Sequence, residues 1–251
     1  MPLVSIITPA FNSAHTLAET IESVRAQTFH DWEMIIVDDC SSDGTTALAS
    51  HYAQLDERIR IIRRAEQGGV SAARNQGMAA ATGRFIAFVD ADDLWLPQKL
   101  ELQLAFMAEH KATIACTAFR RFTDPEKPGR VIKASDLRIT FDSLLRKNAV
   151  GLLTVMIDRD SSGPFAFGEA KQTHEDLALW LEMTKSGHDI YFFDRDLARL
   201  RIVPGIIRQP FKTLISGWRN WRIYRDVAGL PVADALNALT SHAFHAVTKR
   251  L

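Results

Sequence analysis

The sequence lacks several features that would mark a secreted or membrane protein. Only two cysteines, Cys40 and Cys116, occur in 251 residues, with no spacing that suggests a zinc site or a disulfide framework. Such sparse cysteine fits a reducing compartment. No apolar run approaches the roughly 20 residues that a membrane-spanning helix needs. Because the first residues lead straight into an apolar strand without a basic start, we expect no signal peptide and a soluble or peripheral protein.

A net charge is absent as well. Lys+Arg and Asp+Glu each number 30, so nothing in the overall charge points to a nucleic-acid partner. The charge is unevenly spread, because from Arg201 onward eight basic residues stand against two acidic ones. The tail therefore carries +6 and the first 200 residues carry −6. No G-x-G-x-x-G follows any expected strand, which argues against a dehydrogenase, and no internal repeat is present.

What the first half does contain is an alternation of β-prone runs and segments with apolar residues at helical spacing. This order predicts an α/β fold with a mostly parallel sheet and helices on both faces. The expected strands are Val4–Thr8, Glu33–Val37, Ile59–Arg63 and Phe85–Asp90, with helices between them from about Ala14, Thr45 and Val70.

The second half predicts a mixture of elements that continues to about residue 202. Apolar spacing, glycine and proline positions separate helices from strands and loops. We expect helices from Pro97 to His110, over Phe141–Arg146 and over Leu177–Ser186, strands at Thr113–Phe119, Leu152–Ile157, Asp189–Phe193 and Leu197–Ile202, and loops at Thr123–Asp136 and Ser161–Gln172.

Carboxylates follow two of the expected parallel strands. Asp38 and Asp39 end the second strand, and Asp90 and Asp92 end the fourth. The carboxyl ends of parallel strands share one edge, where open α/β folds bind ligands. On an extended chain Asp90 and Asp92 would share one side and could jointly face a divalent cation that bridges two phosphates. A strand end followed by an Asp-rich turn is the structural alternative, but two such ends together indicate a nucleotide site.

Five motifs in order resemble the inverting family 2 glycosyltransferases with the GT-A fold, of the type that builds bacterial surface polysaccharides. Each motif is short, but the five lie at sensible spacing and span about residues 3–205. One departure is Cys40, which stands where glycine is usual. The motifs are the opening Val4–Asn12, the base-binding Ile36–Thr45, the Arg-Asn-x-Gly segment Gly69–Gly77, the DXD-like Asp90–Asp93, and His174-Glu175-Asp176 followed by Leu179-Trp180-Leu181.

The resemblance implies roles for residues around the nucleotide. Asp39 would accept the imide N–H of uracil, which selects the base by leaving mismatched donors unpaired. Pro9 and Phe11 would wall the base and the ribose. Arg74 would lie near the nucleotide and its phosphates, where a guanidinium suits phosphate oxygens. Its structural alternative is an ion pair with Glu66 or an interaction with a helix end.

The resemblance also assigns the acidic turn. Asp90 would reach the ribose or support the metal site from behind, and Asp92 would bind the metal, Mn²⁺ or Mg²⁺, on the diphosphate of a nucleotide-sugar donor. The cation would neutralise the charge that builds on the leaving nucleoside diphosphate. Asp38 and Asp43 are instead expected to be cap and turn residues.

On the acceptor side, the resemblance makes Asp176 the general base for an acceptor hydroxyl, with Glu175 and His174 as acceptor contacts. Thr173-x-x-Asp176 also resembles a capping box, so Asp176 could serve a structural role. The two roles coexist, because the first turn of a helix keeps a carboxylate ionised, as a base requires.

The tail from residue 206 matches the family less well. Arg201-Ile202-Val203-Pro204-Gly205 resembles the family's Tyr-Arg-x-x-Pro-Gly end of the catalytic domain, but Leu200 replaces the tyrosine. Aromatic and other apolar residues then recur at helical spacing beside basic residues, a pattern that suits binding to the anionic face of a membrane. The alternatives are packing on the catalytic domain or in a homodimer. A second helix is expected over Val232–Thr248.

Together these patterns predict a GT-A catalytic domain over residues 1–205, with a nucleotide-binding half to about 97 and an acceptor-binding half from 98, and a basic helical tail over 206–251. We expect a metal-dependent inverting transferase that uses a nucleotide-sugar, UDP-linked by preference, and a saccharide or lipid-linked acceptor. Its expected location is the cytoplasm, at the inner face of the plasma membrane. The alternative is an inactive nucleotide-binding or membrane-associated scaffold with the same fold. A nucleotidyltransferase would need a Gly-rich basic loop after the first strand, which is absent.

Overall fold

A computed structural model describes residues 2–124, 127, 129–168, 175–202, 217–218 and 220–248, with the backbone alone for 242–248. Within these residues the strands form one sheet in the order β3-β2-β1-β4-β9-β6-β10-β5, with β7 beside β6 and β8 beside β10. The strands are β1 Val4–Ala10, β2 Trp32–Asp38, β3 Ile59–Arg63, β4 Phe85–Phe88, β5 Leu94–Trp95, β6 Ile114–Phe122, β7 Val131–Ile132, β8 Arg138–Ile139, β9 Met156–Asp158 and β10 Ile190–Arg201.

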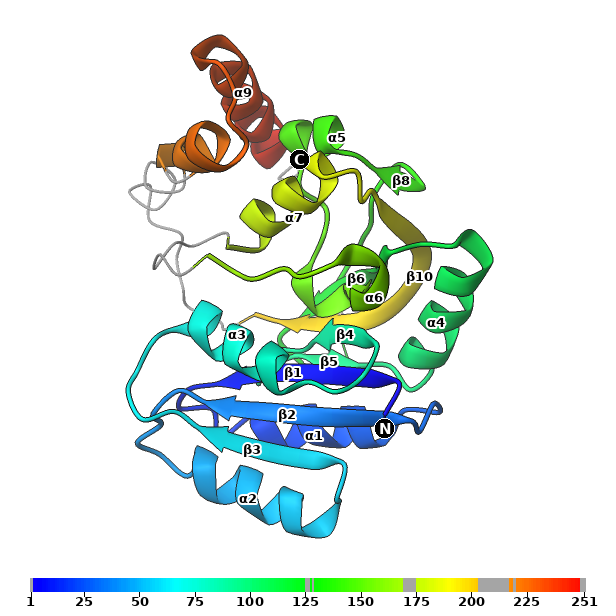
Figure 1. Ribbon diagram of the computed structural model, residues 1–251, viewed down its shortest axis with the longest axis vertical. Helices are drawn as coiled ribbons and strands as arrows, with labels where there is room; N and C mark the ends of the chain where they lie inside the picture. The colour runs from blue at the N-terminus through cyan, green and yellow to red at the C-terminus, as the bar shows by residue number, and fades with distance from the viewer. Residues whose placement is uncertain are drawn as a thin grey trace.

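The long strands of this sheet pair in parallel, as the sequence predicts. β1 lies between β2 and β4, β2 pairs with β3, and β6 pairs with β10, all in parallel. The antiparallel pairings involve the short strands β5, β7, β8 and β9. The parallel strands therefore present their carboxyl ends at one edge, towards which β2, β3 and β10 point at the left of Figure 1.

Helices cover both faces of the sheet, and α1 and α3 lie on opposite faces of β1 and β2 (Figure 1). The helical elements are α1 Leu17–Arg25, α2 Thr45–Leu55, α3 Val70–Ala80, α4 Lys99–His110, α5 Phe141–Arg146, the 3₁₀ turn η1 Leu152–Thr154, α6 Arg159–Ser162, α7 Glu175–Lys185, the π-helical turn η2 Ile223–Val227 and α9 Val232–Thr248.

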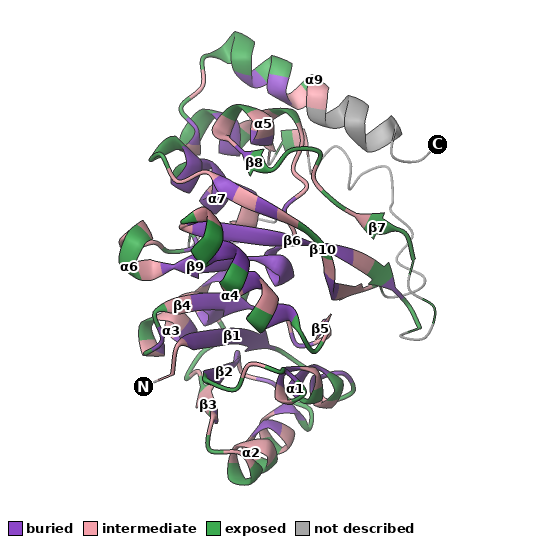
Figure 2. Cartoon of the chain, turned by 90° about the vertical axis from the view of Figure 1, so that its right-hand side faces the viewer, coloured by how far each residue is buried: buried purple, intermediate pink, exposed green. Residues whose placement is uncertain are grey.

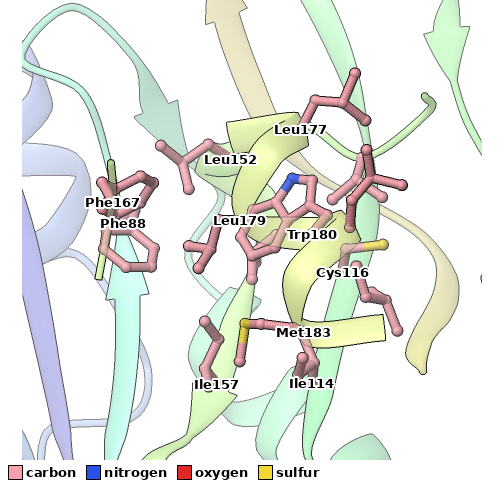
Figure 3. Packing of buried hydrophobic residues seen from close by; sticks show 14 of the residues in the cluster. Phe88, Ile114, Cys116, Leu152, Ile157, Phe167, Leu177, Leu179, Trp180 and Met183 are labelled. Atoms are coloured by element: carbon pink, nitrogen blue, oxygen red, sulfur yellow. The ribbon is translucent and has the colours of Figure 1, made fainter. Parts of the chain in front are cut away.

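Two hydrophobic cores result, one on each face of the sheet, because successive strand residues point to opposite faces. Ile7 and Ile35 belong to the core under α3 and α7, whereas Ile6 and Met34 belong to the core under α1 and α4. β1 and β2 are buried along their whole length (Figure 2). At the centre of the first core Trp180 of α7 is fully buried (Figure 3). This rigid sheet holds the loops at its carboxyl edge.

Several elements differ from the sequence predictions. Leu94–Trp95 forms a short strand on β10 where a turn and a helix start were expected. The strand expected over Leu152–Ile157 is divided into η1 and the antiparallel β9. The two strands expected over residues 189–202 are one strand, β10, with register shifts between Phe193 and Ala198.

The chain after β10 is described only in part. Residues 217–218 and 220–222 are helical and continue into η2, and α9 has the bounds that the sequence predicts. The predicted domain boundary at 205/206 and most of the first tail helix lie outside the described residues. Among the residues that are described, no helix is both long and apolar enough to cross a bilayer.

Candidate active site

The acidic segment after β4 is a turn rather than a continuation of the strand. β4 ends at Phe88, and the amide of Asp93 donates to the carbonyl of Asp90 at 3.0 Å. The expectation that Asp90 and Asp92 share one side of an extended chain is therefore wrong, because the chain reverses between them. The turn still lies at the carboxyl edge of the sheet and carries its carboxylates there.

Arg74 of α3 bridges this turn to the start of α7. Its Nη2 lies 2.7 Å from Oδ1 of Asp90, and its Nη1 lies 2.8 Å from Oε1 of Glu175. The guanidinium is almost fully buried and also lies over the ring of Phe167. Burial opposes its charge, but the two carboxylates outweigh that cost and raise the pKa of Arg74. This ion pairing replaces the alternative of a pair with Glu66.

The Arg-Asn-x-Gly segment has a structural reason at each of its fixed positions. While Arg74 forms the bridge, Asn75 exchanges two hydrogen bonds of 2.8 Å with the backbone of Phe167. Gly77 lies so close to β1 that an added Cβ would stand 2.6 Å from Ile7. The motif thus joins α3 to the sheet, to the loop at Phe167 and to the acidic turn.

Asp39 is held at the end of β2 by the loop before α3. Its carboxylate accepts the amides of Gly68 at 2.9 Å and Gly69 at 2.8 Å, and Nε of Arg64 lies 2.8 Å from Oδ1. A carboxylate has about four acceptor positions, so one remains for a further donor such as a base imide. The predicted base contact stays a prediction, for which one acceptor position of the carboxylate is open.

The loops after β1 and β2 are bonded to each other. Asn12 Oδ1 accepts the amide of Ser42 at 2.9 Å, and Asp43 accepts from Ala14 and Thr45. Asn12 and Cys40 both have left-handed backbones, with φ of 49° and 65°. The latter value explains why glycine suits position 40.

The residues expected to wall the base differ in exposure. Phe11 is 47% exposed at the tip of the loop after β1, where a base could lie against it. Pro9 is buried within β1, in register with Val37. Asp38 is fully buried and accepts the amide of Ser41 and the hydroxyl of Thr46, in agreement with a turn role.

No cation pairs with the carboxylate of Asp92 within the described chain, in contrast to that of Asp90, which Arg74 holds. Burial first and the charge of Asp90 second raise the pKa of Asp92. Burial, Asp90 and Asp92 raise the pKa of Asp93 well above its usual value. Among the described residues no group of three His, Cys, Asp or Glu side chains could hold a metal. The site suits a cation that takes one or two carboxylates and completes its shell with diphosphate oxygens and water.

The acceptor-side residues begin α7. Glu175 faces Arg74, and the half-buried Asp176 accepts the amide of Leu177 at 2.8 Å. His174 lies outside the described residues, as does the threonine of the expected capping box. Because one guanidinium holds both Asp90 and Glu175, the donor-side and acceptor-side motifs meet at this edge, with Asp176 next in the chain.

Some residues at the site have no signal in the sequence. Arg64 contacts Asp39 and α3, and the exposed His15 lies near enough to Asp92 to lower its pKa in part. Arg201 of β10, which the sequence singles out only as the start of the Arg201–Gly205 segment, donates to the carbonyl of Asp92 at 2.7 Å, a contact that no motif predicts. Basic residues of this kind occur throughout the chain, so only the folded structure distinguishes them.

In this arrangement, acids at the carboxyl edge of a parallel sheet face an acidic helix start, at the place where open α/β folds bind ligands. Comparison with known proteins identifies the family. The model of the family described as Glycosyl transferase family 2 matches residues 5–161. The chain belongs to this family and is a glycosyltransferase.

Curated relatives support the assignment over more of the chain. The glycosyltransferase TuaG of Bacillus subtilis (strain 168), named for teichuronic acid biosynthesis, is 37% identical over 251 residues, which cover 100% of this chain and 98% of TuaG. WfgD of Escherichia coli, a UDP-Glc:α-D-GlcNAc-diphosphoundecaprenol β-1,3-glucosyltransferase, is 35% identical over 186 residues, 74% of this chain and 71% of its own.

A solved structure shows the same fold. TarS (residues 1–349) of S. aureus superimposes with a TM-score of 0.71 at 19% identity, covering 96% of this chain and 70% of the TarS chain. TarS has also been solved in complex with UDP-GlcNAc. At this identity the likeness concerns the fold alone, and it confirms the expected GT-A architecture.

Proposed function

We propose that this glycosyltransferase transfers a sugar from a UDP-sugar, with inversion and with a divalent cation, to a saccharide on a lipid-linked acceptor in surface polysaccharide biosynthesis. The observation that carries the proposal is the Arg74 bridge, which brings the donor-side Asp90 and the acceptor-side Glu175 to one guanidinium. The names of the two relatives supply the substrate classes: UDP-Glc and a diphosphoundecaprenol-linked sugar for WfgD, and teichuronic acid for TuaG.

On the donor side, the residues present fit the group that the reaction needs. The carboxylate of Asp92, which pairs with no cation in the described chain and has a raised pKa, would gain from a nearby cation. When bound, Mn²⁺ or Mg²⁺ would supply Lewis-acid stabilisation of the departing diphosphate. Asp39 would accept the imide N–H of uracil, and Phe11 would lie against the base. Asp90, oriented by Arg74, would reach the ribose.

On the acceptor side, Asp176 would act as the general base. Its carboxylate takes the proton of the acceptor hydroxyl while that oxygen bonds to the anomeric carbon from the face opposite the nucleotide. The bond to the UDP oxygen breaks at the same time, so the configuration inverts. The position of Asp176 in the first turn of α7 favours the ionised form that a base requires. The preceding residue, Glu175, is held by Arg74.

The test is turnover of UDP-sugars by Asp176→Asn, with Glu182→Gln at the far end of the same helix as the matched control. Loss of a general base costs about 10²- to 10⁴-fold in kcat, so Asp176→Asn should lose activity on this scale while UDP binding persists. Full activity of Asp176→Asn would contradict the assignment. An inactive wild type with UDP-, GDP- and dTDP-sugars would favour the scaffold alternative, and NMR of the product anomer tests inversion.

We also propose that the tail contacts the inner face of the membrane, where a lipid-linked acceptor would lie. In the described part of the tail, Trp218 is 65% exposed, and the exposed Arg225 belongs to the same helical stretch. An exposed aromatic with basic residues suits an anionic lipid surface. The wild type should co-sediment with vesicles that contain anionic lipid, and Trp218→Ala should co-sediment less. If neither protein co-sediments and the wild type has a dimeric mass in solution, the homodimer alternative is favoured.

A further inference from the structure

Arg201, the last residue of β10, is bonded to the acidic turn through both its backbone and its side chain. Its amide donates to Oδ1 of Asp93 at 2.8 Å, and its Nε donates to the carbonyl of Asp92 at 2.7 Å. Asp93 is only 1% exposed, so the carboxylate that receives this amide is anchored inside the protein. One residue of β10 thus holds two consecutive residues of the turn.

The guanidinium of Arg201 is itself fixed on two other sides. Its Nη2 lies 2.6 Å from Oε2 of Glu19 in α1, and its centre lies 4.6 Å from the ring of Phe122. Its side chain is 15% exposed. A guanidinium with a carboxylate, a ring and a carbonyl around it has little freedom to turn, so the carbonyl that it binds is held in place.

The effect of this arrangement falls on Asp92. Its carboxylate pairs with no cation among the described residues. The turn around it is closed by the amide of Asp93, which donates to the carbonyl of Asp90, and the carbonyl of Asp92 itself is held by Arg201. The backbone from which the Asp92 side chain extends is therefore fixed on both sides. Groups that orient a metal ligand in this way change metal affinity about 10- to 100-fold when they are removed.

We propose that Arg201 is a positioning residue for the donor-site cation, which sets the orientation of Asp92 by holding its carbonyl and the carboxylate of Asp93. The inference rests on the proposed function, since Asp92 is the residue proposed there to bind the cation. Lysine cannot replace arginine in this role, because a single ammonium on a flexible stem cannot bond Asp92 and Glu19 in two fixed directions.

The experiment measures the affinity for UDP by calorimetry with Mn²⁺ and with EDTA, and the bound fraction of Mn²⁺ by electron paramagnetic resonance. The variants are Arg201→Lys and Glu19→Gln. Arg199→Lys is the matched control, because Arg199 lies two residues earlier on β10, has a side chain 14% exposed, and pairs with Asp196 at 2.6 Å rather than with the turn.

We expect Arg201→Lys to weaken Mn²⁺-dependent UDP binding about 10-fold and to leave UDP binding in EDTA unchanged. Glu19→Gln should weaken it about threefold, as for the loss of one half-exposed ion pair. Arg199→Lys should bind as the wild type does. If Arg201→Lys does not fold, the change at the half-exposed Glu19 carries the same test.

Two results would overturn the inference. The first is equal Mn²⁺ affinity in Arg201→Lys, Glu19→Gln and the wild type. The second is a loss of UDP affinity in the variants that is equal with Mn²⁺ and with EDTA, because a general disturbance of the fold would give that result. A wild type that binds UDP equally well with and without Mn²⁺ would instead contradict the metal dependence in the proposed function. The failures of the two proposals are thereby distinguished.

Discussion

The carboxylates of β2 and those that follow β4 look alike in the sequence but differ in the structure. Glu33, Asp38 and Asp39 of β2 and its end are each surrounded by hydrogen-bond donors from backbone amides, hydroxyls or arginines. After β4, Asp90 shares Arg74 with Glu175, and Asp92 has no paired cation among the described residues. Buried carboxylates that accept several hydrogen bonds stabilise the strand end and its loops, whereas a carboxylate without a paired cation can bind a ligand.

The pKa shifts reflect this difference. Burial raises the pKa of Glu33, but hydrogen bonds from Ser5, Thr82 and Arg60 together outweigh burial and lower it to about 2. At Asp92, burial and the charge of Asp90 dominate, and the pKa is raised. The first carboxylate therefore stabilises the fold, and the second costs folding free energy that a bound cation could recover.

The largest effect on stability is expected at Glu33. Its pKa lies below the unfolded value of 4.5, so its contribution is present above about pH 4.5 and declines as the pH falls towards about 2. A shift of this size corresponds to roughly 3 kcal/mol. Urea unfolding should show Glu33→Gln less stable than the wild type at neutral pH, with the difference shrinking on acidification. The control Glu57→Gln, at an exposed acid, should show no such change, and a constant difference at Glu33 would refute the prediction.

A smaller effect is expected at Asp38. Its removal in Asp38→Ala leaves the amide of Ser41 and the hydroxyl of Thr46 without their acceptor, at a cost of about 2 kcal/mol. Asp92→Ala is the matched comparison and should lose little or no stability, because its raised pKa marks a group that is unfavourable in its charged form. Equal losses in both variants, measured by urea unfolding, would remove the distinction between the two strand ends.

The smallest effect is expected at Cys40, which directly follows Asp39 at the end of β2. Its left-handed backbone, with φ of 65°, costs an L-residue about 1 kcal/mol relative to glycine. Cys40→Gly should therefore raise the free energy of unfolding by about this amount, whereas Cys40→Ala, which keeps a Cβ, should not. If alanine and glycine give the same stability, backbone strain is not the reason for glycine at this position in relatives.

The sequence predicts the regular parts of the fold well, because local patterns control them. α5 and α9 have the predicted bounds, since apolar spacing and a capping threonine at 140 or a proline at 231 mark them. β5 was not predicted, because two residues become a strand only through pairing with β10. The division of Leu152–Ile157 also depends on partners, as β9 runs antiparallel between β4 and β6.

The candidate site could be predicted as a set of residue types but not as a geometry. Motifs identify Asp39, Arg74 and Asp92, yet the pairing of Arg74 with Glu175 joins residues 101 positions apart. The reversal of the chain between Asp90 and Asp93 is a local turn of the kind that an Asp-rich segment favours. The hold of Arg201 on this turn, however, depends on contacts across 108 and 109 positions. Such long-range contacts have no local pattern, so only the fold reveals which carboxylates pair with an arginine.

The most direct test of this account is calorimetric titration of UDP into the wild type and Asp92→Asn, each with and without Mn²⁺. We expect UDP binding to be much weaker without the metal and without the Asp92 carboxylate, with roughly a 100-fold loss of affinity in Asp92→Asn in the presence of Mn²⁺ and with unchanged stability of the variant. Metal-independent binding, or equal binding by wild type and Asp92→Asn, would contradict the claim that the free carboxylate after β4 holds the donor-site cation.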